Sequence, residues 1–224
     1  MSFVNGTEFW PMPISQDHKR AYDDDKGPNT GGMGAYSPVP QIGDDVVQQA
    51  IETIVKPTVE AMVAEGTPFT GILYAGLIAT QDGPKVIEFN ARFGDPETEV
   101  VLPKLTSDLG AGITAILNGE TPEFTWDEDN ATLGVVLASD GYPGEIVKGA
   151  HIPQIATDAD SHVYYAGVAR GDDGLVANSG RVLLVEASAP DLAAAQRKVY
   201  GILDAVNTEG MFYRHDIGAK ALKA

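Results

Sequence analysis

The chain has 224 residues, of which 43% are hydrophobic, and it carries no cysteine and a formal net charge of −17 at pH 7. The absence of cysteine excludes disulfides, thiolate nucleophiles and zinc sites built on sulfur. The negative charge argues against nucleic-acid binding through a general basic surface. Because no apolar run approaches the length of a membrane span and no basic-then-apolar leader is present, we expect a cytoplasmic globular protein with neither nucleic acid nor a membrane as a partner.

The first predicted element is a hairpin over residues 3–10, because Asn5-Gly6 is a dipeptide typical of a tight turn between two strands. The chain begins at this hairpin, and we expect the corresponding edge of its sheet to lack a neighbour.

Residues 15–38 show neither helical nor strand periodicity, and so long an irregular segment is expected to be either functional or mobile. Its composition favours function. Polar and charged residues stand together at 17–20, and the glycines of 31–34 let the backbone approach a ligand and offer successive N–H groups to an anion. The acidic run 23–25 lacks the spacing of a calcium loop, and we expect it to be solvated.

Residues 44–65 are predicted to form a helix that Asp44 caps, with an apolar stripe for the core and a kink or break at Pro57. The stripe consists of Val47, Ile51, Ile54, Thr58 and Met62. The apolar run 71–79 predicts a buried central strand, and the turn after it predicts an antiparallel partner over 85–92.

That partner strand carries an unusual polar face. Glu88, Asn90 and Arg92 alternate with apolar residues, so all three are expected on one side of the strand. A carboxylate and an amide oxygen are ligands for Mg²⁺, and a guanidinium is a forked donor for phosphate. The alternative, a solvent-facing sheet surface without function, stays open on this stretch alone.

The second half of the chain reads as a small α+β unit. A helix over 106–118 and a polar connector over 121–130 are followed by predicted strands at 132–139, 161–169 and 181–187 and by a helix over 190–206. We place a domain boundary in the connector, giving domains 1–122 and 127–224. The polar stretches 178–181 and 213–217 could line a cleft, but we assign them to turns and surface.

A nucleophilic hydrolase is not supported. Ser37 and Ser139 stand outside any Gly-x-Ser-x-Gly elbow. The four histidines, at 18, 151, 162 and 215, lack the spacing of a zinc protease. Oxygen ligation of a divalent cation by Glu88 and Asn90 remains the best-supported chemistry.

Three long motifs carry a resemblance to a known family. The stretches 16–20, 27–38 and 92–97 are similar to those of the phosphoribosylamine–glycine ligases, which belong to the ATP-grasp superfamily. The stretches 178–184 and 212–218 resemble the same family, so the similarity extends over essentially the whole chain. The resemblance implies an α/β to α+β fold: the C-terminal half of an ATP-grasp domain, followed by a small α+β domain.

The resemblance also implies a reaction of purine biosynthesis. ATP phosphorylates glycine, and the amine of 5-phosphoribosylamine then attacks the acyl phosphate, which yields ADP and phosphate. Glu88 and Asn90 would ligate Mg²⁺ or Mn²⁺, Arg92 would hold the transferred phosphoryl group, and Asp95 would receive the glycine ammonium. The residues implied to bind phosphate or ribose are Asp17, His18, Lys19, Arg20, Thr30, Gly31, Gly32 and Gly34.

The chain departs from this family in length, because it resembles only the C-terminal half. We therefore expect a fragment that is inactive alone and that self-associates through exposed apolar surface. Two alternatives stay open. The chain could belong to another ATP-grasp carboxylate–amine ligase, or it could be a non-catalytic module that assembles with a separate N-terminal half.

Overall fold

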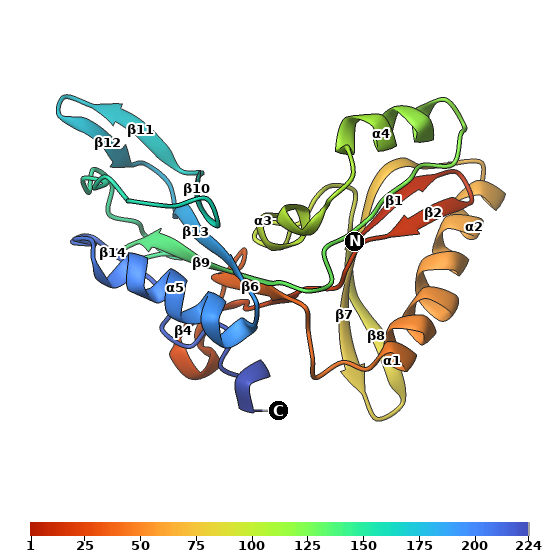
Figure 1. The fold of residues 1–224 in the computed structure, drawn as a ribbon, viewed down its shortest axis with the longest axis horizontal. Coiled ribbons are helices and arrows are strands. Elements are labelled where there is room, and N and C mark those ends of the chain that lie inside the picture. Colours follow the sequence, from red (N-terminus) through yellow and green to blue (C-terminus); the bar gives the residue numbers. More distant parts are fainter. Residues whose placement is uncertain (224) are drawn as a thin grey trace. The chain divides into compact units, whose positions relative to one another are not determined.

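The computed structural model describes residues 1–223, and these form two compact units (Figure 1). Unit 1 comprises Met1–Ile14, Val39–Gly94 and Leu105–Asp127, and unit 2 comprises Ser15–Pro38, Asp95–Lys104 and Glu128–Ala224. These units are discontinuous in sequence and differ from the continuous domains expected. The chain does pass from unit 1 to unit 2 inside the polar connector. Independent folding of residues 1–122 and 127–224 stays a prediction.

Unit 1 is built on a four-stranded antiparallel sheet with the order β2-β1-β7-β8. The predicted hairpin is confirmed: β1 (Ser2–Asn5) and β2 (Glu8–Pro11) pair with Asn5 opposite Glu8, and Gly6 has a φ of 63° in the turn. β7 (Thr70–Thr80) pairs with β1 and with β8 (Gly83–Asn90), so its predicted central position and the second hairpin are also confirmed.

The burial expected for β7 is wrong, and β8 is largely exposed as well. Only Leu73 of β7 is fully buried, and Ile78 lies half-exposed near the far end of the strand. In β8, Ile87 is 67% exposed and Phe89 is 41% exposed. The pairing of β7 with β8 shifts register between Glu88 and Val86, which leaves Ile87 without a partner in β7. The alternation expected for Ile87 and Phe89 is therefore broken at this bulge.

The long helix runs continuously through Pro57. α1 (Asp44–Ala50) leads into a π-helical turn at Ile51–Val55 and then into α2 (Lys56–Ala64). Pro57 is the second residue of α2, directly after the π-helical turn. Gly43, not Asp44, is the N-cap residue, and no side chain caps this end.

The π-helical turn also shifts the face that the helix buries. The extra residue in a π turn rotates the following turns relative to α1. The core contacts therefore come from Val55 and Val59, which pack with Val4 and Leu73, while Met62 flanks them. The predicted stripe is displaced by about one residue.

α4 (Leu109–Leu117) is shorter than expected and is capped by Asp108, whose carboxylate accepts from the Ala111 amide at 2.8 Å. Gly119, with a φ of 75°, follows the helix as predicted. Leu117, which was expected in the apolar face, is 66% exposed.

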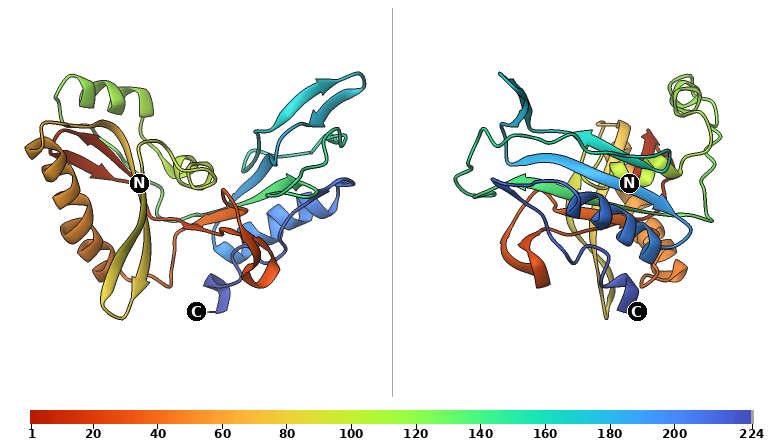
Figure 2. Two further views of the ribbon diagram at one scale, coloured as in Figure 1. Left: turned by 180° about the vertical axis from the view of Figure 1, so that it is seen from behind. Right: turned by 60° about the vertical axis from the view of Figure 1, so that its left-hand side comes forward.

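Unit 2 contains a six-stranded sheet. Its path is β10 (Ser161–Tyr165), β13 (Arg181–Ala189), β9 (Ala131–Ser139), β6 (Gly34–Ser37) and β3 (Gln16–Asp17), and β14 (Met211–Phe212) also pairs with β9. α5 (Leu192–Asp204) lies along β9 and β13, as the views in Figure 2 show, and buries Leu192, Ala195, Val199 and Leu203.

The expectation of an irregular segment over residues 15–38 is wrong. This segment contributes β3 and β6 to the large sheet and forms a separate hairpin from β4 (Arg20–Tyr22) and β5 (Lys26–Asn29), with the 3-10 turn Asp23–Asp25 between them. β6 is fully buried and pairs with β9, about a hundred residues away. Because β3 and β6 are short and β6 pairs with a strand distant in sequence, no local periodicity predicted these strands.

The predicted strand 161–169 is divided at Ala166 and Gly167 into β10 and β11 (Val168–Gly171), and β11 forms a hairpin with β12 (Gly174–Ala177). α3 (Thr98–Val101) packs against β6 and β9. Short 3-10 turns complete the unit at Leu102–Lys104 and Ala221–Lys223. Among the described residues, none of the helices has both the length and the apolar character to span a bilayer.

Candidate active site

Glu88 and Asn90 lie on the same face at the end of β8, in unit 1. Glu88 stands opposite Gly76 of β7, and Asn90 stands opposite Tyr74. A Cβ atom at Gly76 would come within 3.1 Å of Glu88 Cγ, so the glycine leaves the carboxylate room. Glu88 is exposed and Asn90 half-buried, which leaves their oxygens accessible.

This pair fits a hard divalent cation. Two oxygen donors two residues apart on a strand suit Mg²⁺ or Mn²⁺, which take several further ligands from water and from substrate phosphates. In the described part of the chain, no cluster of three or more Asp, Glu or His residues could hold a metal by itself. Glu88 and Asn90 would therefore supply only part of the ligands of a cation held here.

Arg92 lies beyond the strand, because β8 ends at Asn90. Its side chain is exposed, and Nη1 donates to the Phe93 carbonyl oxygen at 2.7 Å. The expectation that Arg92 continues the alternation of the strand is therefore wrong. The chain then enters unit 2 between Gly94 and Asp95.

The remaining predicted site residues belong to unit 2, where Asp95 meets a residue that the sequence analysis assigned to a turn. Arg181 Nη1 donates to Asp95 Oδ1 and to the Asp95 carbonyl oxygen, both at 2.8 Å. The same nitrogen lies 3.3 Å from the Gly31 carbonyl oxygen and 3.4 Å from that of Gly32. Arg181 therefore joins β13, the Asp95 turn and the glycine-rich loop.

The glycine-rich loop is held by a network of its own. Thr30 donates through both its amide and its hydroxyl to the Lys19 carbonyl oxygen, and its hydroxyl accepts from the Gly32 amide at 3.0 Å. The Gly31 amide donates to the Tyr142 hydroxyl at 2.9 Å. Gly34 lies in β6, where a Cβ would come within 2.6 Å of the Gly134 carbonyl oxygen. Thr30 and Gly34 thus fix the loop in place.

Replacing Gly32 with Ala is expected to destabilise unit 2 by about 2 kcal/mol or more. Gly32 has a φ of 124°, and a Cβ there would lie 2.4 Å from Pro96 Cδ and 2.6 Å from Asp17 Oδ1, so strain adds to a clash. Urea unfolding measures the loss. Gly66→Ala is the matched control, because Gly66 also has a positive φ but nothing lies within 4 Å of its Cβ position. Equal losses in the two variants would contradict the clash.

Asp17 and His18 are interior residues. Burial, together with the nearby Glu97 charge, raises the pKa of Asp17 to about 6, although Lys19 lies 2.7 Å from Asp17 Oδ2 and opposes the shift. His18 is 2% exposed, and burial followed by the Arg214 charge lowers its pKa to about 4. The neutral ring lies with Nδ1 3.3 Å from the Gly34 carbonyl oxygen.

Glu99 adds a half-buried acid near Asp95. Burial, followed by the Asp95 charge, raises the pKa of Glu99 to about 7, while Arg181 acts in the opposite direction. Its Oε2 is buried without a hydrogen-bond partner among the described residues. Ionising Glu99 therefore costs free energy in the folded state.

Glu99→Gln is expected to stabilise the chain at pH 8 and to have little effect near pH 4. A folded-state pKa of about 7 against the ordinary 4.5 means that the folded state binds the proton more tightly, so wild-type stability is lost as pH rises from about 4.5 through 7. The gain at pH 8 is at most about 3 kcal/mol. Urea unfolding at both pH values measures it, with the exposed Glu120→Gln as control. A parallel pH profile for wild type and Glu99→Gln would contradict the assignment.

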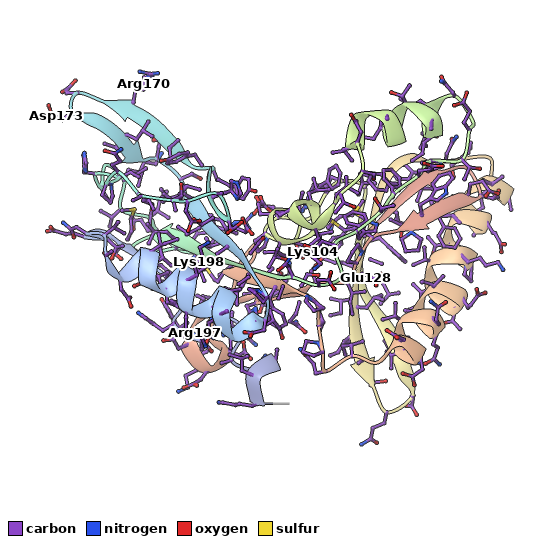
Figure 3. The ribbon with its side chains drawn as sticks, viewed as in Figure 1. Lys104, Glu128, Arg170, Asp173, Arg197 and Lys198 are labelled. Atoms are coloured by element: carbon purple, nitrogen blue, oxygen red, sulfur yellow. The ribbon has the colours of Figure 1, made fainter. Side chains whose placement is uncertain are left out.

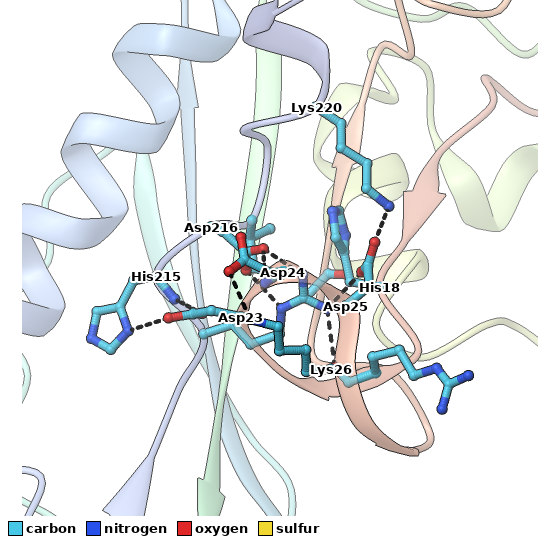
Figure 4. A network of polar contacts seen from close by, with 12 residues as sticks. His18, Asp23, Asp24, Asp25, Lys26, His215, Asp216 and Lys220 are labelled. Carbon is cyan, nitrogen blue, oxygen red and sulfur yellow. Dashed lines mark hydrogen bonds and ion pairs between the residues drawn. The ribbon is translucent and has the colours of Figure 1, made fainter.

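A third polar cluster, shown in Figure 4, was missed by the sequence analysis. Arg214 is 1% exposed and is bidentate to Asp216, with Nε to Oδ1 at 2.7 Å and Nη2 to Oδ2 at 2.8 Å. Its Nη1 donates to Asp25 Oδ1 at 3.1 Å and to the Arg20 carbonyl oxygen at 3.0 Å. The assignment of 213–217 to surface duty is wrong for Arg214.

The same cluster corrects the reading of the acidic run 23–25 as merely solvated. Asp23 accepts from the His215 amide at 2.7 Å and lies 3.1 Å from His215 Nδ1, and Asp25 pairs with Lys220 as well as Arg214. Asp24, by contrast, fits the expected solvated run, because its pair with Lys26 is exposed. The signal available in the sequence was complementary charge: an acidic run early in the chain and a basic one near its end.

Comparison with known proteins shows which protein family these features belong to. A family model described as the phosphoribosylglycinamide synthetase ATP-grasp (A) domain matches residues 1–98, and one described as the C domain of the same synthetase matches residues 132–220. The chain belongs to the phosphoribosylglycinamide synthetase family. The order of the two matches along the chain is the order predicted from the motifs.

Individual relatives agree with the family models. The chain is 54% identical to phosphoribosylamine–glycine ligase of Streptococcus pyogenes serotype M6, over 99% of this chain and 53% of the relative. The corresponding ligase of Lactococcus lactis is also 54% identical, over 99% of this chain and 53% of the relative. The chain therefore spans about half the length of the curated relatives it matches.

Solved structures confirm the fold. The crystal structure of phosphoribosylamine–glycine ligase from Thermotoga maritima matches with a TM-score of 0.85 and 36% identity, over 96% of this chain and 54% of that one. The biotin carboxylase domain of the Hydrogenobacter thermophilus 2-oxoglutarate carboxylase matches with a TM-score of 0.67 at 12% identity, over 95% of this chain and 45% of that one. This second match shows the fold alone. The predicted fold class, a partial ATP-grasp domain followed by an α+β domain, is confirmed.

Proposed function

We propose that this chain supplies the metal-binding part and the C-terminal part of a ligase that joins glycine to 5-phosphoribosylamine with cleavage of ATP to ADP and phosphate. One observation supports the proposal above all. In a member of the phosphoribosylglycinamide synthetase family, β8 presents Glu88 and Asn90 on one accessible face, with Arg92 following directly. No such combination is needed for the sheet itself.

The proposed reaction has two steps. The γ-phosphoryl group of ATP passes to a glycine carboxylate oxygen, which leaves ADP. The amine nitrogen of phosphoribosylamine then bonds to the glycyl carbonyl carbon, the C–O bond to phosphate breaks, and the amine loses a proton. Phosphoryl transfer depends mainly on positioning and on neutralising charge on the phosphate oxygens. A divalent cation supplies that neutralisation when bound.

In this proposal, residues of unit 1 bind the cation and the phosphoryl group. Glu88 and Asn90 hold the cation, Mg²⁺ or Mn²⁺, through side-chain oxygens. Among the residues that the structure describes, the exposed guanidinium of Arg92 donates one hydrogen bond, to the Phe93 carbonyl oxygen. Its other donors can hold the phosphoryl group in flight or the acyl phosphate by charge-assisted hydrogen bonds.

In this proposal, residues of unit 2 bind glycine or hold the glycine-rich loop in place. Asp95 keeps one carboxylate oxygen outside its pair with Arg181 and is half-exposed, which suits an ammonium group. Asp17, Thr30, Gly32 and Gly34 are engaged with their own segment, and the buried His18 ring faces the Gly34 carbonyl oxygen. We propose that they shape the glycine-rich loop, while Lys19 and Gly31 stand nearer to ligand.

The partners in this proposal are small molecules, and the compartment is the cytoplasm.

ADP release tests the proposed function. ATP, glycine, freshly generated phosphoribosylamine and Mg²⁺ are incubated with the chain alone, and then with the N-terminal half of the Streptococcus pyogenes relative. We expect glycine-dependent ADP release and an amide product only in the mixture. Full activity of the chain alone would show that the nucleotide site needs no further residues. No activity in either case would favour a non-catalytic module.

A further inference from the structure

β8 is an edge strand of unit 1, and its outer side is exposed. In the sheet order β2-β1-β7-β8 its neighbour is β7 (Figure 1). In the described part of the chain, no backbone hydrogen bond joins residues 85–89 to a segment other than β7. All five of these residues are exposed. An edge strand with unpaired N–H and C=O groups is a template for pairing with another strand.

The exposed edge is also apolar. Val86, Ile87 and Phe89 are large hydrophobic side chains that remain exposed, and the bulge leaves Ile87 without a partner in β7. Three such side chains within four residues form a contiguous apolar surface, and surfaces of this kind mark interaction sites.

An apolar groove of about 380 Å³ borders this edge. Val86 and Phe89 form one wall, and the π-helical turn with α2 forms the other, chiefly through Ile54, Pro57, Ala61 and Met62. Edge and groove both lie within unit 1. We call residues 85–89 together with this groove the β8 surface.

Two residues of opposite charge flank the apolar stretch. Lys85 and Glu88 are exposed, and neither makes an ion pair or side-chain hydrogen bond with a described residue. Lys85 stands opposite Ile78 of β7, and Glu88 stands opposite Gly76. The bulge thus places Lys85 and Glu88 two ladder positions apart, on one face, whereas residues three apart on a regular strand lie on opposite faces.

This arrangement is self-complementary about a two-fold axis. When two β8 edges pair antiparallel with Val86 facing Val86 of the other copy, Lys85 of each copy stands opposite Glu88 of the other. Opposite charges that face each other across two strands attract. The two Ile87 side chains flank the axis. A two-fold contact uses the same edge of both copies, so it closes as a dimer.

The net charge of the chain sets the conditions for such a contact. Two chains with a formal net charge of −17 repel each other. At physiological ionic strength, however, charges more than about 8 Å apart are largely screened. The two Lys85–Glu88 pairs act at contact distance and are screened less.

We propose that the β8 surface binds a second copy of this chain, through antiparallel pairing of the two β8 edges about a two-fold axis at Val86. The exposed edge is short, so the interface belongs to the weak class that buries less than about 1,200 Å². The dimer is therefore reversible. The contact rests on the geometry of unit 1 and does not depend on the proposed function.

Sedimentation velocity over a concentration series tests the proposal. A chelator is present, because a cation on Glu88 would compete with the ion pair. We expect a reversible monomer–dimer equilibrium. Ile87→Lys is expected to weaken the dimer about tenfold or more, because it places two ammonium groups beside the axis.

Leu117→Lys is the matched control for Ile87→Lys. Leu117 is an equally exposed apolar residue of unit 1 but lies on α4, outside the β8 surface. We expect its replacement to leave the dimer unchanged. A monomer at every concentration, or equal weakening by the two substitutions, would overturn the proposal.

An exchange of charges tests the pairing register. Lys85→Glu is expected to weaken the dimer about fivefold, because it places two carboxylates opposite each other, and adding Glu88→Lys is expected to restore it to within about twofold. Arg197→Glu is the matched control, because it changes the net charge equally and Arg197 projects, exposed, from α5 of unit 2 (Figure 3). Failure of the double variant to recover, or an equal effect of Arg197→Glu, would overturn the proposal.

Discussion

Glu88→Gln is expected to lower ligase turnover of the complemented mixture by about 10³-fold. Gln keeps the shape of Glu but removes the negative charge that holds a divalent cation at β8. Charge stabilisation by such a cation contributes several kcal/mol in the transition state, and each 1.36 kcal/mol is about tenfold in rate. ADP release at saturating ATP and glycine measures the effect.

Glu60→Gln is the matched control for this prediction. Glu60 is exposed on α2 of the same unit, and its loss of charge is expected to leave turnover within about twofold. Binding of Mn²⁺ in the presence of ATP, followed by electron paramagnetic resonance, gives a second readout. A reduction of turnover below tenfold, with Mn²⁺ affinity unchanged, would show that Glu88 is not a metal ligand.

Arg214→Met is expected to lower the free energy of unfolding by about 3 kcal/mol. Met replaces the apolar stem but leaves the Asp216 and Asp25 carboxylates and the Arg20 carbonyl oxygen without their shared donor. Removing one partner of a buried ion pair costs about 3–5 kcal/mol, and the partial exposure of both carboxylates places this case at the lower end. Urea unfolding at pH 7 measures it.

The pH dependence of the same variant gives an independent check. Burial alone would raise the pKa of Asp216, but its hydrogen bonds to Arg214 outweigh burial and lower the pKa to about 2. Because the folded-state pKa lies below the ordinary 3.8, this contribution is present above pH 4 and is lost as pH falls toward 2. We expect the gap between wild type and Arg214→Met to shrink over that range.

The exposed pair of Lys26 and Asp24 provides the comparison. Their nitrogen and oxygen lie 3.3 Å apart, and both side chains are largely exposed. Lys26→Met is therefore expected to change stability by less than about 1 kcal/mol. If Arg214→Met cost no more than Lys26→Met, the buried cluster would have no special structural role.

The sequence by itself determined the elements with strong local signals. Asn5-Gly6 predicted the first hairpin, and the apolar run before Asp82 predicted the second, because turn chemistry and apolar runs act over a few residues. The alternation at 88–90 placed Glu88 and Asn90 on one face of β8. The motifs at 16–20, 27–38 and 92–97 gave the family, which the two family models confirm.

Only the tertiary structure decided which polar residues act together. Arg181 looked like part of a turn, yet it meets Asp95 and the glycine-rich loop from across unit 2. Arg214 looked exposed, yet it is enclosed by an acidic run about 190 residues earlier. Strands such as β6 are too short to show a period, and ion pairs between distant segments leave no local pattern. Their partners are selected by long-range packing, which a sequence window does not contain.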